Sequence, residues 1–294
     1  MRKYIQKTFK VLVMGLVLSS TLLVAQKNPV TAEVAEVAEV TATAEVVEAT
    51  AETMAETTEE THINTELLNL AGEQRMLSQR IAKNYFYKEM GVNPSKAGKQ
   101  LKESIAQFNQ SLEKINTQIS NKKIKKMIRF VNMSKDDFLS ISSAKYSSEN
   151  AALVLDLSES MLEGSQYIVK FIKVNSPKQS SALIDLSGRQ RMLSQRIAKY
   201  YISYQAGIKD KNSIDQMNKA VKEFTEAHIK LINNKTNSAA INIKLEKVDE
   251  LWEIVYDFYL DVEEGGLPVI VYNTTDNIMR EMDIVTKMYV DLQN

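Results

Sequence analysis

The sequence predicts an all-α protein of two tandem antiparallel four-helix bundles that form a pseudo-twofold dimer within one chain. Glycine and proline are scarce (9 and 4 of 294 residues), which favours helices. Apolar residues recur at helical spacing from residue 61 onward. The decapeptide QRMLSQRIAK occurs twice, at 74–83 and at 190–199. The offset of 116 residues between the copies predicts a repeated unit of four helices with short loops.

The first 32 residues are predicted to be a signal peptide. A basic segment, MRKYIQKTFK, precedes an apolar run of 15 residues, VLVMGLVLSSTLLVA. A membrane span needs about 20 apolar residues, whereas the apolar part of a signal peptide has about 7 to 15. We therefore expect cleavage after Ala25 or Ala32 and a mature protein in the periplasm or secreted. An uncleaved N-terminal anchor is the alternative.

Composition limits the function of the remaining chain. Residues 33–60 hold nine glutamates and no basic residue, which predicts an acidic low-complexity tether. Residues 61–294 hold 32 basic and 28 acidic residues, too small an excess for nucleic-acid binding but compatible with one small anion site. Cysteine is absent, which excludes disulfides and thiolate metal sites.

Helix start and stop signals divide residues 61–175 and 176–294 into two sets of four helices. Gly91 and Gly207 each end the first helix of a set. Asn93-Pro94 and Asn175-Ser176-Pro177 are start signals for the helices that follow. The predicted helices cover about 62–90, 94–119, 121–144, 149–174, 177–206, 212–233, 238–262 and 267–293.

On a helix, the decapeptide divides into two faces. Gln74, Leu77 and Ile81 continue the apolar stripe and are expected in the bundle core. A neighbouring face combines small residues, which let another backbone come close, with polar donors. This face holds Gly72, Arg75, Gln79 and Ala82 in the first copy, and Gly188, Arg191, Gln195 and Ala198 in the second. Arg80 and Arg196 lie about 140° further round and are expected to flank the same region.

The charge around each decapeptide is unusual, because residues 74–88 and 188–209 contain basic residues and no acid. If the two first helices pack together, Arg75 and Arg191 approach each other, and their like charges repel in a partly dry interface. A small oxyanion between them would replace that repulsion by charge-assisted hydrogen bonds to flat guanidinium groups. Three roles stay open for these arginines: an anion site, helix packing, or a solvent-exposed surface.

At these residues the sequence resembles a known family. NLAGEQRMLSQRIAK (69–83) and DLSGRQRMLSQRIAK (185–199) resemble the signature of the PilJ-type sensor domain, the N-terminal domain of type IV pili methyl-accepting chemotaxis transducers. The signature is similar to a segment of the NarX/NarQ nitrate/nitrite sensor kinases. The resemblance implies a periplasmic four-helix bundle that pairs through its first helix and holds an anion on the axis of the pair. Arg75 and Arg191 would bind that anion, with Gly72 and Gly188 where the backbone approaches it.

The predicted function is therefore binding of a small oxyanion, nitrate or nitrite first, between the two first helices. The candidate ligand-binding residues are Arg75, Arg191, Gly72, Gly188, Arg80, Arg196, Gln79 and Gln195. The copies differ in ways that make the site asymmetric, at Asn69/Asp185, Ala71/Ser187 and Glu73/Arg189. Because the sequence shows no kinase or methyl-accepting region up to Asn294, we expect a membrane receptor or sensor kinase to read the signal.

The alternative function is that of a helical interaction or scaffold protein of the cell envelope, linked to pili or chemotaxis. Its arginines would pack, or bind a partner's carboxylates. An enzyme is not expected, because the sequence has no nucleophile motif and no phosphate-binding loop. The two histidines, His62 and His228, form no metal-ligand pair, so neither a metal nor a cofactor is predicted.

Three further segments have structural predictions. His228 is expected to be a partly exposed packing residue on a helix. Trp252, Tyr256 and Tyr259 lie at helical spacing and are expected to pack in the core. The basic run NKKIKKMIR (121–129) is expected on a solvated helix face, with contact to a membrane or another anionic surface as the alternative.

Overall fold

The computed structural model of the chain describes residues 65–174 and 178–292. The predicted signal peptide (1–32), the acidic tether (33–60) and His62 lie outside the described residues. Residues 61–294 form one compact unit. Regular structure in the described part of this unit is entirely helical, which confirms the all-α fold class.

Eight α-helices and one short 3-10 helix make up the described part of the chain. They are α3 (Thr65–Glu89), α4 (Pro94–Gln118), α5 (Lys122–Ser142), α6 (Ser148–Val174), α7 (Lys178–Gln205), α8 (Lys211–Ile232), α9 (Ala239–Leu260), η1 (Val262–Glu264) and α10 (Pro268–Asp291). Every predicted helix is present, and its described ends agree with the prediction to within two residues. The division into units of residues 61–175 and 176–294 stays a prediction.

Two glycines end the first helices, as predicted. Gly91 and Gly207 have φ angles of 69° and 100°, in the left-handed region that residues with a Cβ avoid. Pro94 lies in the first turn of α4, where its missing N–H costs nothing. Asn93 precedes α4 as predicted, but its side chain makes no capping hydrogen bond.

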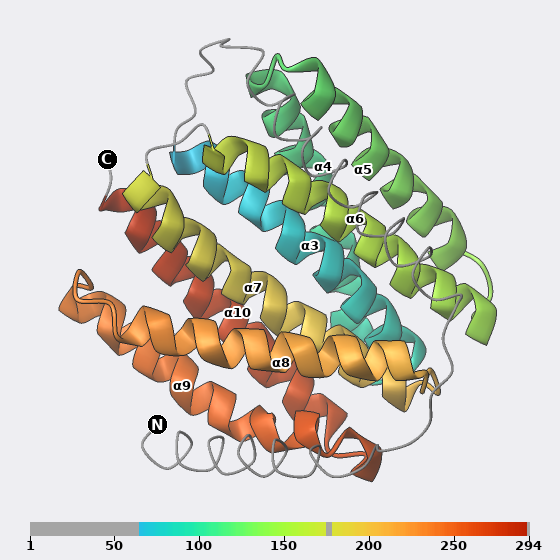
Figure 1. Cartoon of the computed structure of the whole chain (residues 1–294). Helices are drawn as coiled ribbons and strands as arrows, with labels where there is room; N and C mark the ends of the chain where they lie inside the picture. Colours follow the sequence, from blue (N-terminus) through green and yellow to red (C-terminus); the bar gives the residue numbers. More distant parts are fainter. Residues whose placement is uncertain (1–64, 175–177, 293–294) are drawn as a thin grey trace, which may run out of the picture. The chain divides into compact units, whose positions relative to one another are not determined.

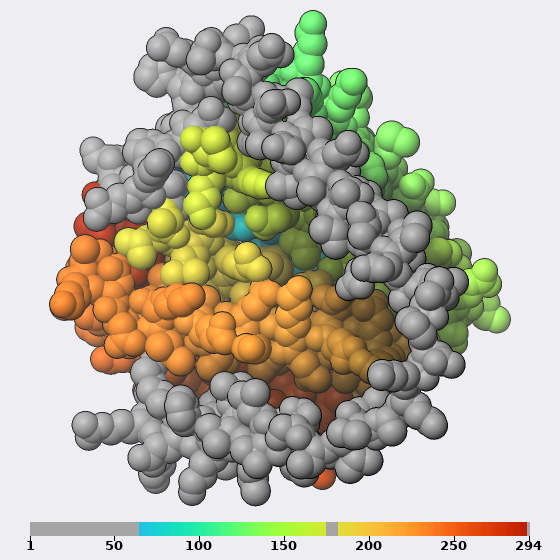
Figure 2. Space-filling model, viewed as in Figure 1, coloured from blue at the N-terminus to red at the C-terminus, as the bar shows by residue number. Residues whose placement is uncertain are grey.

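α3 and α7 lie side by side and begin at the same end of the unit (Figure 1). α3 also packs against α4 and α6, and α7 packs against α8 and α10, so each first helix is central to its own set of four. α5 packs on α6, and α9 packs on α10. In Figure 2, where no grey atoms cover the surface, only a small area of α3 is visible between α6 and α7. The polar side chains that are buried between α3 and α7 must find partners within the protein.

The apolar stripe of the decapeptide lies in the core, as predicted. Leu77 and Ile81 are fully buried, and so is Gln74. Gln74 donates through Nε2 to the backbone oxygen of Phe108 on α4 at 2.9 Å. The equivalent glutamine of the second copy makes the same bond to α8 at 2.9 Å. The stripe thus joins each first helix to its second helix, which leaves the neighbouring face to meet the other first helix.

Candidate ligand-binding site

Arg75 and Arg191 lie between α3 and α7, and each is only 1% exposed. A Cβ built on Gly72 would lie 3.3 Å from Nη2 of Arg191 and 3.5 Å from Nη2 of Arg75. A Cβ on Gly188 would lie 3.3 Å and 3.6 Å from the same two atoms. Both guanidinium groups therefore meet in the space that the two glycines leave open. The structure brings these four predicted residues together, and the solvent-exposed alternative is wrong for both arginines.

Arg75 is held by the opposite first helix and by the last helix of its own set. Its Nη1 lies 2.9 Å from Oδ1 of Asp185 on α7, and it donates to Oε1 of Gln166 on α6 at 3.0 Å. Burial lowers the pKa of Arg75. Burial also raises the pKa of Asp185, but Arg75 and Lys173 outweigh it and hold that pKa below its usual range. Asp185 is therefore a charged partner of Arg75.

Arg191 has the matching partners with the two copies exchanged. Its Nη2 donates to Oδ1 of Asn69 on α3 at 2.8 Å, and its Nη1 donates to Oδ1 of Asp283 on α10 at 2.5 Å. Asn69 is the counterpart of Asp185 at the offset of 116. In the third and fourth helices of each set the offset is 117, as SESML (158–162) and TDNIM (275–279) show, so Asp283 is the counterpart of Gln166. Each arginine thus has one carboxylate, but the two carboxylates come from different positions of the repeat. The predicted asymmetry at Asn69/Asp185 is present in the contacts.

The Nε atoms of Arg75 and Arg191 are buried and have no hydrogen-bond partner among the described residues. The carboxylates of Asp185 and Asp283 approach Nη1 of their arginine instead. A buried donor without a partner costs on the order of 1 to 3 kcal/mol, and an acceptor oxygen would remove that cost. Two guanidinium edges with free donors between the same two helices suit a small planar oxyanion.

Gln79 and Gln195, which the sequence placed at the site, instead join each first helix to the last helix of its set. Gln79 Nε2 donates to the backbone oxygen of Ser158 at 2.9 Å, and Gln195 Nε2 donates to that of Thr275 at 3.2 Å. Their Oε1 atoms are buried and have no partner among the described residues. These two glutamines thus connect α3 to α6 and α7 to α10.

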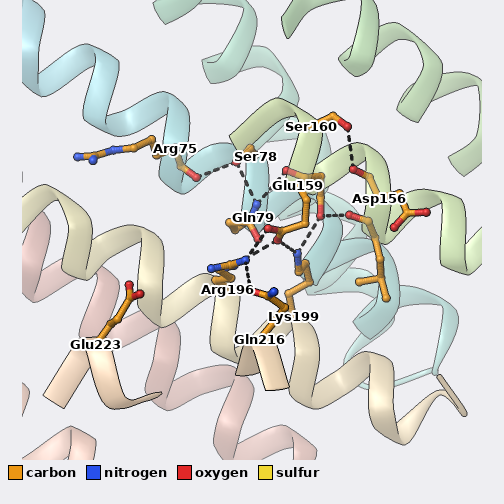
Figure 3. Close-up of polar contacts among 12 residues, drawn as sticks. Arg75, Ser78, Gln79, Asp156, Glu159, Ser160, Arg196, Lys199, Gln216 and Glu223 are labelled. Atoms are coloured by element: carbon orange, nitrogen blue, oxygen red, sulfur yellow. Dashed lines mark hydrogen bonds and ion pairs between the residues drawn. The ribbon is translucent and has the colours of Figure 1, made fainter. Parts of the chain in front are cut away.

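Arg196 belongs to a separate cluster, shown in Figure 3. Its Nη2 donates to Oε2 of Glu159 at 2.6 Å, and Lys199 Nζ donates to Oε1 of the same carboxylate at 2.5 Å. Arg196 also donates to Gln216 at 3.0 Å. In Figure 3 the guanidinium group of Arg75 points away from this cluster. The eight predicted site residues therefore divide between the Arg75–Arg191 region and its surroundings.

Sequence reasoning missed two buried ion pairs that cross between the copies. Lys83 of α3 lies 2.5 Å from Asp276 of α10, and Lys199 of α7 lies 2.5 Å from Glu159 of α6. Both lysines are fully buried, and burial lowers the pKa of each to about 8. Burial raises the pKa of both carboxylates, but the lysines outweigh it and lower each to about 2. The signal was the repetition of the final lysine in a decapeptide without acids.

The other sequence predictions have mixed outcomes. His228 is only 2% exposed, not partly exposed as predicted, because it lies against α9, with Oδ1 of Asp249 3.6 Å from its Nε2, and stacks on Phe224 of its own helix with a centroid distance of 5.9 Å. Burial lowers its pKa to about 4, so its imidazole is neutral at pH 7. Trp252 and Tyr259 lie in the core as predicted, and Tyr256 is partly buried against it. Most basic residues of the run 121–129 are exposed, which confirms a solvated face.

Among the described residues, no group of three or more histidine and acidic side chains could hold a metal ion. None of the described helices is long and apolar enough to cross a bilayer.

The comparisons with known proteins point to one family. The family model described as the N-terminal domain of type IV pili methyl-accepting chemotaxis transducers (PilJ) matches residues 57–123 and 174–255. These two segments hold 149 of the 294 residues, and each contains one copy of the decapeptide. No curated protein and no solved structure gives a significant match. The chain therefore belongs to the PilJ family, whose members are sensory domains of chemotaxis transducers.

Proposed function

We propose that the chain is a ligand-binding sensory protein that takes a small planar oxyanion, nitrate or nitrite first, between α3 and α7. The observation that supports the proposal is the convergence of two buried guanidinium groups beside Gly72 and Gly188. Each group keeps an Nε donor without a partner among the described residues. Ligand oxygens would complete the hydrogen bonding of both arginines at once.

The charge at this site favours a monoanion. Asp185 and Asp283 each compensate one arginine, so the four groups together are close to neutral. A planar monoanion adds one charge and matches the flat edge of a guanidinium, whereas a dianion would face two nearby carboxylates. Asn69 on one side and Asp185 on the other give the two ends of the ligand different neighbours.

The signal would be a change in how α3 and α7 pack. An anion that accepts from both arginines pulls the two first helices together, and the two copies would then move about a pseudo-twofold axis. The contacts of Arg75 and Arg191, which recur with the copies exchanged, support that axis. Gln79 and Gln195 would pass the movement to α6 and α10. A membrane receptor or sensor kinase would read it, outside the cytoplasmic membrane, where the leader-like residues 1–32 would direct the protein.

Calorimetry with nitrate, nitrite, chloride and acetate tests the site. The variant Arg75→Gln/Arg191→Gln removes both guanidinium groups, and Arg129→Gln is the control, because Arg129 is an exposed arginine of α5, a helix that does not contribute to the site. We expect the wild type and the control to bind nitrate or nitrite and the double variant to lose at least tenfold in affinity. No heat with any of these anions, or equal affinity in the double variant, would contradict the proposal.

The competing role is structural, since both arginines already have carboxylate partners within the chain. If the arginines only pack, the double variant loses stability while the wild type binds no anion. The protein would then be an envelope scaffold, and a pull-down from solubilised envelopes with the wild type and the double variant would find partners of its surface. Circular dichroism of the double variant separates lost binding from lost folding.

A further inference from the structure

A second cationic cluster lies around Asp276 of α10. The Oδ1 atom of Asp276 accepts from Lys83, and its Oδ2 accepts from Gln100 Nε2 at 2.8 Å. Lys96 Nζ lies 3.5 Å from the same Oδ2. Asp276 is only 1% exposed, so these three side chains take the place of water around its carboxylate.

Arg80 adds a third positive charge to this cluster. Arg80 lies three residues before Lys83 on α3, so the two side chains are neighbours on one side of that helix. The counterpart of Arg80, Arg196, bonds to Glu159, the counterpart of Asp276. In agreement with this placement, the charge of Arg80 lowers the pKa of both Asp276 and Lys83. The Nε of Arg80 is buried and has no hydrogen-bond partner among the described residues. No carboxylate of residues 65–174 and 178–292 forms an ion pair with it. Three cations therefore share one carboxylate, which leaves an excess of two positive charges.

The ring of Tyr272 packs against the two lysines of the cluster. Lys83 and Lys96 lie 4.7 Å and 4.5 Å from the centroid of the Tyr272 ring. The Tyr272 hydroxyl lies 2.9 Å from the side-chain amides of both Asn84 and Gln100, so it donates to one amide and accepts from the other. Among the described residues, the Nε of Arg80 is thus the unpartnered donor in this region of net positive charge.

In the other copy of the repeat, the positive and negative charges at the equivalent positions balance each other (Figure 3). Glu159, the counterpart of Asp276, accepts from Arg196, the counterpart of Arg80, through both of its oxygens. Lys96 has Asn212 as its counterpart, and Tyr272 has a leucine. Two cations share one carboxylate there, with the charge of Asp156 close by. Of the two clusters, only the one around Asp276 has an excess of positive charge and an arginine without a partner among the described residues.

We propose that Arg80 and Lys96 form a second anion site, separate from Arg75 and Arg191, for a phosphate group. The excess of two charges suits a dianion, and Arg80 has no acidic partner among the described residues, whereas Arg75 and Arg191 each have a carboxylate of their own. Phosphate oxygens accept strong hydrogen bonds from guanidinium, ammonium and amide donors. The carboxylate of Asp276 does not repel the ligand strongly, because Lys83, Gln100 and Lys96 already engage it.

Titration with inorganic phosphate at low ionic strength tests this site. The readouts are calorimetry and the ¹⁵N–¹H signal of the arginine Nε groups. We expect Arg80→Gln to weaken phosphate binding at least tenfold and Lys96→Asn to weaken it about threefold to tenfold, since each removes one charge-assisted bond. The matched control is Arg196→Gln, which changes the equivalent residue of the balanced cluster and should leave the affinity unchanged.

The variant Arg75→Gln separates the two sites, because it should weaken nitrate binding and leave phosphate binding intact. Glycerol phosphate tests whether the ligand is a phosphomonoester or the free ion. If its binding depends on Arg80 as strongly as the binding of inorganic phosphate does, the ligand is a phosphomonoester. If only inorganic phosphate binds, the ligand is the free ion. Lys96→Asn keeps the test valid if Arg80→Gln does not fold, because asparagine already stands at that position of the second copy. No phosphate binding by the wild type, or binding that neither variant weakens, overturns the proposal.

Discussion

The third helices of the two copies, α5 and α9, pack differently although their first helices share an identical decapeptide. α5 lies close to α6 because residue 164 is glycine: a Cβ there would lie 2.4 Å from Val131 and 3.3 Å from Met127 and Phe130. The counterparts of Gly164 and Met127 are Glu281 and Lys244, which form an ion pair at 2.9 Å. Close apolar packing in one copy is thus replaced by a polar contact in the other.

The opposite side of each third helix shows the complementary difference. In the second copy, Trp252 of α9 stacks on Phe224 of α8 with a centroid distance of 4.1 Å and fills the space between these helices. The counterpart of Trp252 is Lys135, which bonds to Asn109 at 2.9 Å. A groove of about 610 Å³ remains between α4 and α5, lined by Asn109, Leu112, Glu113, Asn116, Ile128, Arg129, Asn132 and Met133.

The comparison teaches which contacts constrain the sequence. α3 and α7 contact each other and the two last helices, so a change in one decapeptide alters contacts in both copies. α5 and α9 pack mainly within their own copy, so each can exchange glycine for glutamate or lysine for tryptophan with a local adjustment. The two copies are identical in sequence where their first helices meet, and they differ in the outer helices.

The largest difference between the copies should come from their crossed ion pairs. Asp276→Asn leaves Lys83 buried without a charged partner, and we expect a loss of about 4 kcal/mol in the free energy of unfolding. Glu159→Gln should cost about 2 kcal/mol, because Glu159 is 30% exposed and water can replace part of its role. Urea denaturation at pH 7 measures both. Equal losses would show that the exposure of the carboxylate does not matter.

The packing of α5 on α6 gives the next effect. Gly164→Ala places a methyl group against Val131 and should cost about 3 kcal/mol by overpacking. The control, Glu281→Ala, removes the equivalent side chain of the other copy and should cost less than about 1 kcal/mol, since its partner Lys244 is partly exposed. The shift of the urea midpoint reports each change. A Gly164→Ala variant as stable as the wild type would mean that α5 moves freely away from α6.

Acid should act on both copies through the same pair of carboxylates. The folded-state pKa values of Asp276 and Glu159 are lowered to about 2, below the values near 4 in an unfolded chain. Their stabilisation is therefore fully present above about pH 4 and is lost as the pH falls from about 4 to 2, by about 2 kcal/mol for each carboxylate. Urea midpoints between pH 6 and pH 2 measure the loss. The slope should be smaller in Asp276→Asn, and an unchanged slope would contradict the assignment.

Two helical glycines give the smallest effect and the sharpest contrast. Gly98→Ala should raise stability by about 1 kcal/mol, because alanine favours a helix and the nearest atom to the new Cβ, Cδ of Lys88, is 3.9 Å away. Gly72→Ala gains the same propensity but presses on the guanidinium groups at 3.3 Å, so its stability should change by less than about 1 kcal/mol. Thermal melts compare the two, and calorimetry should show weaker nitrate binding only for Gly72→Ala.

The helices could be predicted because they follow from local spacing, whereas the convergence of Arg75, Arg191, Gly72 and Gly188 was expected from the resemblance to the PilJ-type sensor domain. Helical periodicity fixes which residues share a face, but it does not show that two such faces meet. The order of the four helices in each copy was equally accessible, since glycine and proline mark the breaks. The pseudo-twofold relation of the copies stays a prediction.

The acidic partners could not be predicted in the same way. Asp283 reaches Arg191 from a helix 92 positions further along the chain, and periodicity does not orient one helix about another. The burial of Lys83 and Lys199 was not predicted, because a lysine on a helix is rarely buried unless it is paired. Their acidic partners lie 193 and 40 residues away in the sequence. His228 was placed too near the surface because its burial depends on the packing of α9 against α8, where Asp249 lies 3.6 Å from its Nε2, and periodicity within α8 does not show that contact.

The exchange of partners across the α3–α7 interface has a genetic consequence. In a homodimer, a substitution at a site on the twofold axis is always introduced twice, once on each side. Here Asn69 and Asp185 are encoded by separate codons, so that an acid is present beside Arg75 and an amide beside Arg191. A chain that carries both copies can therefore adapt each side of its binding site independently, which two identical subunits cannot do.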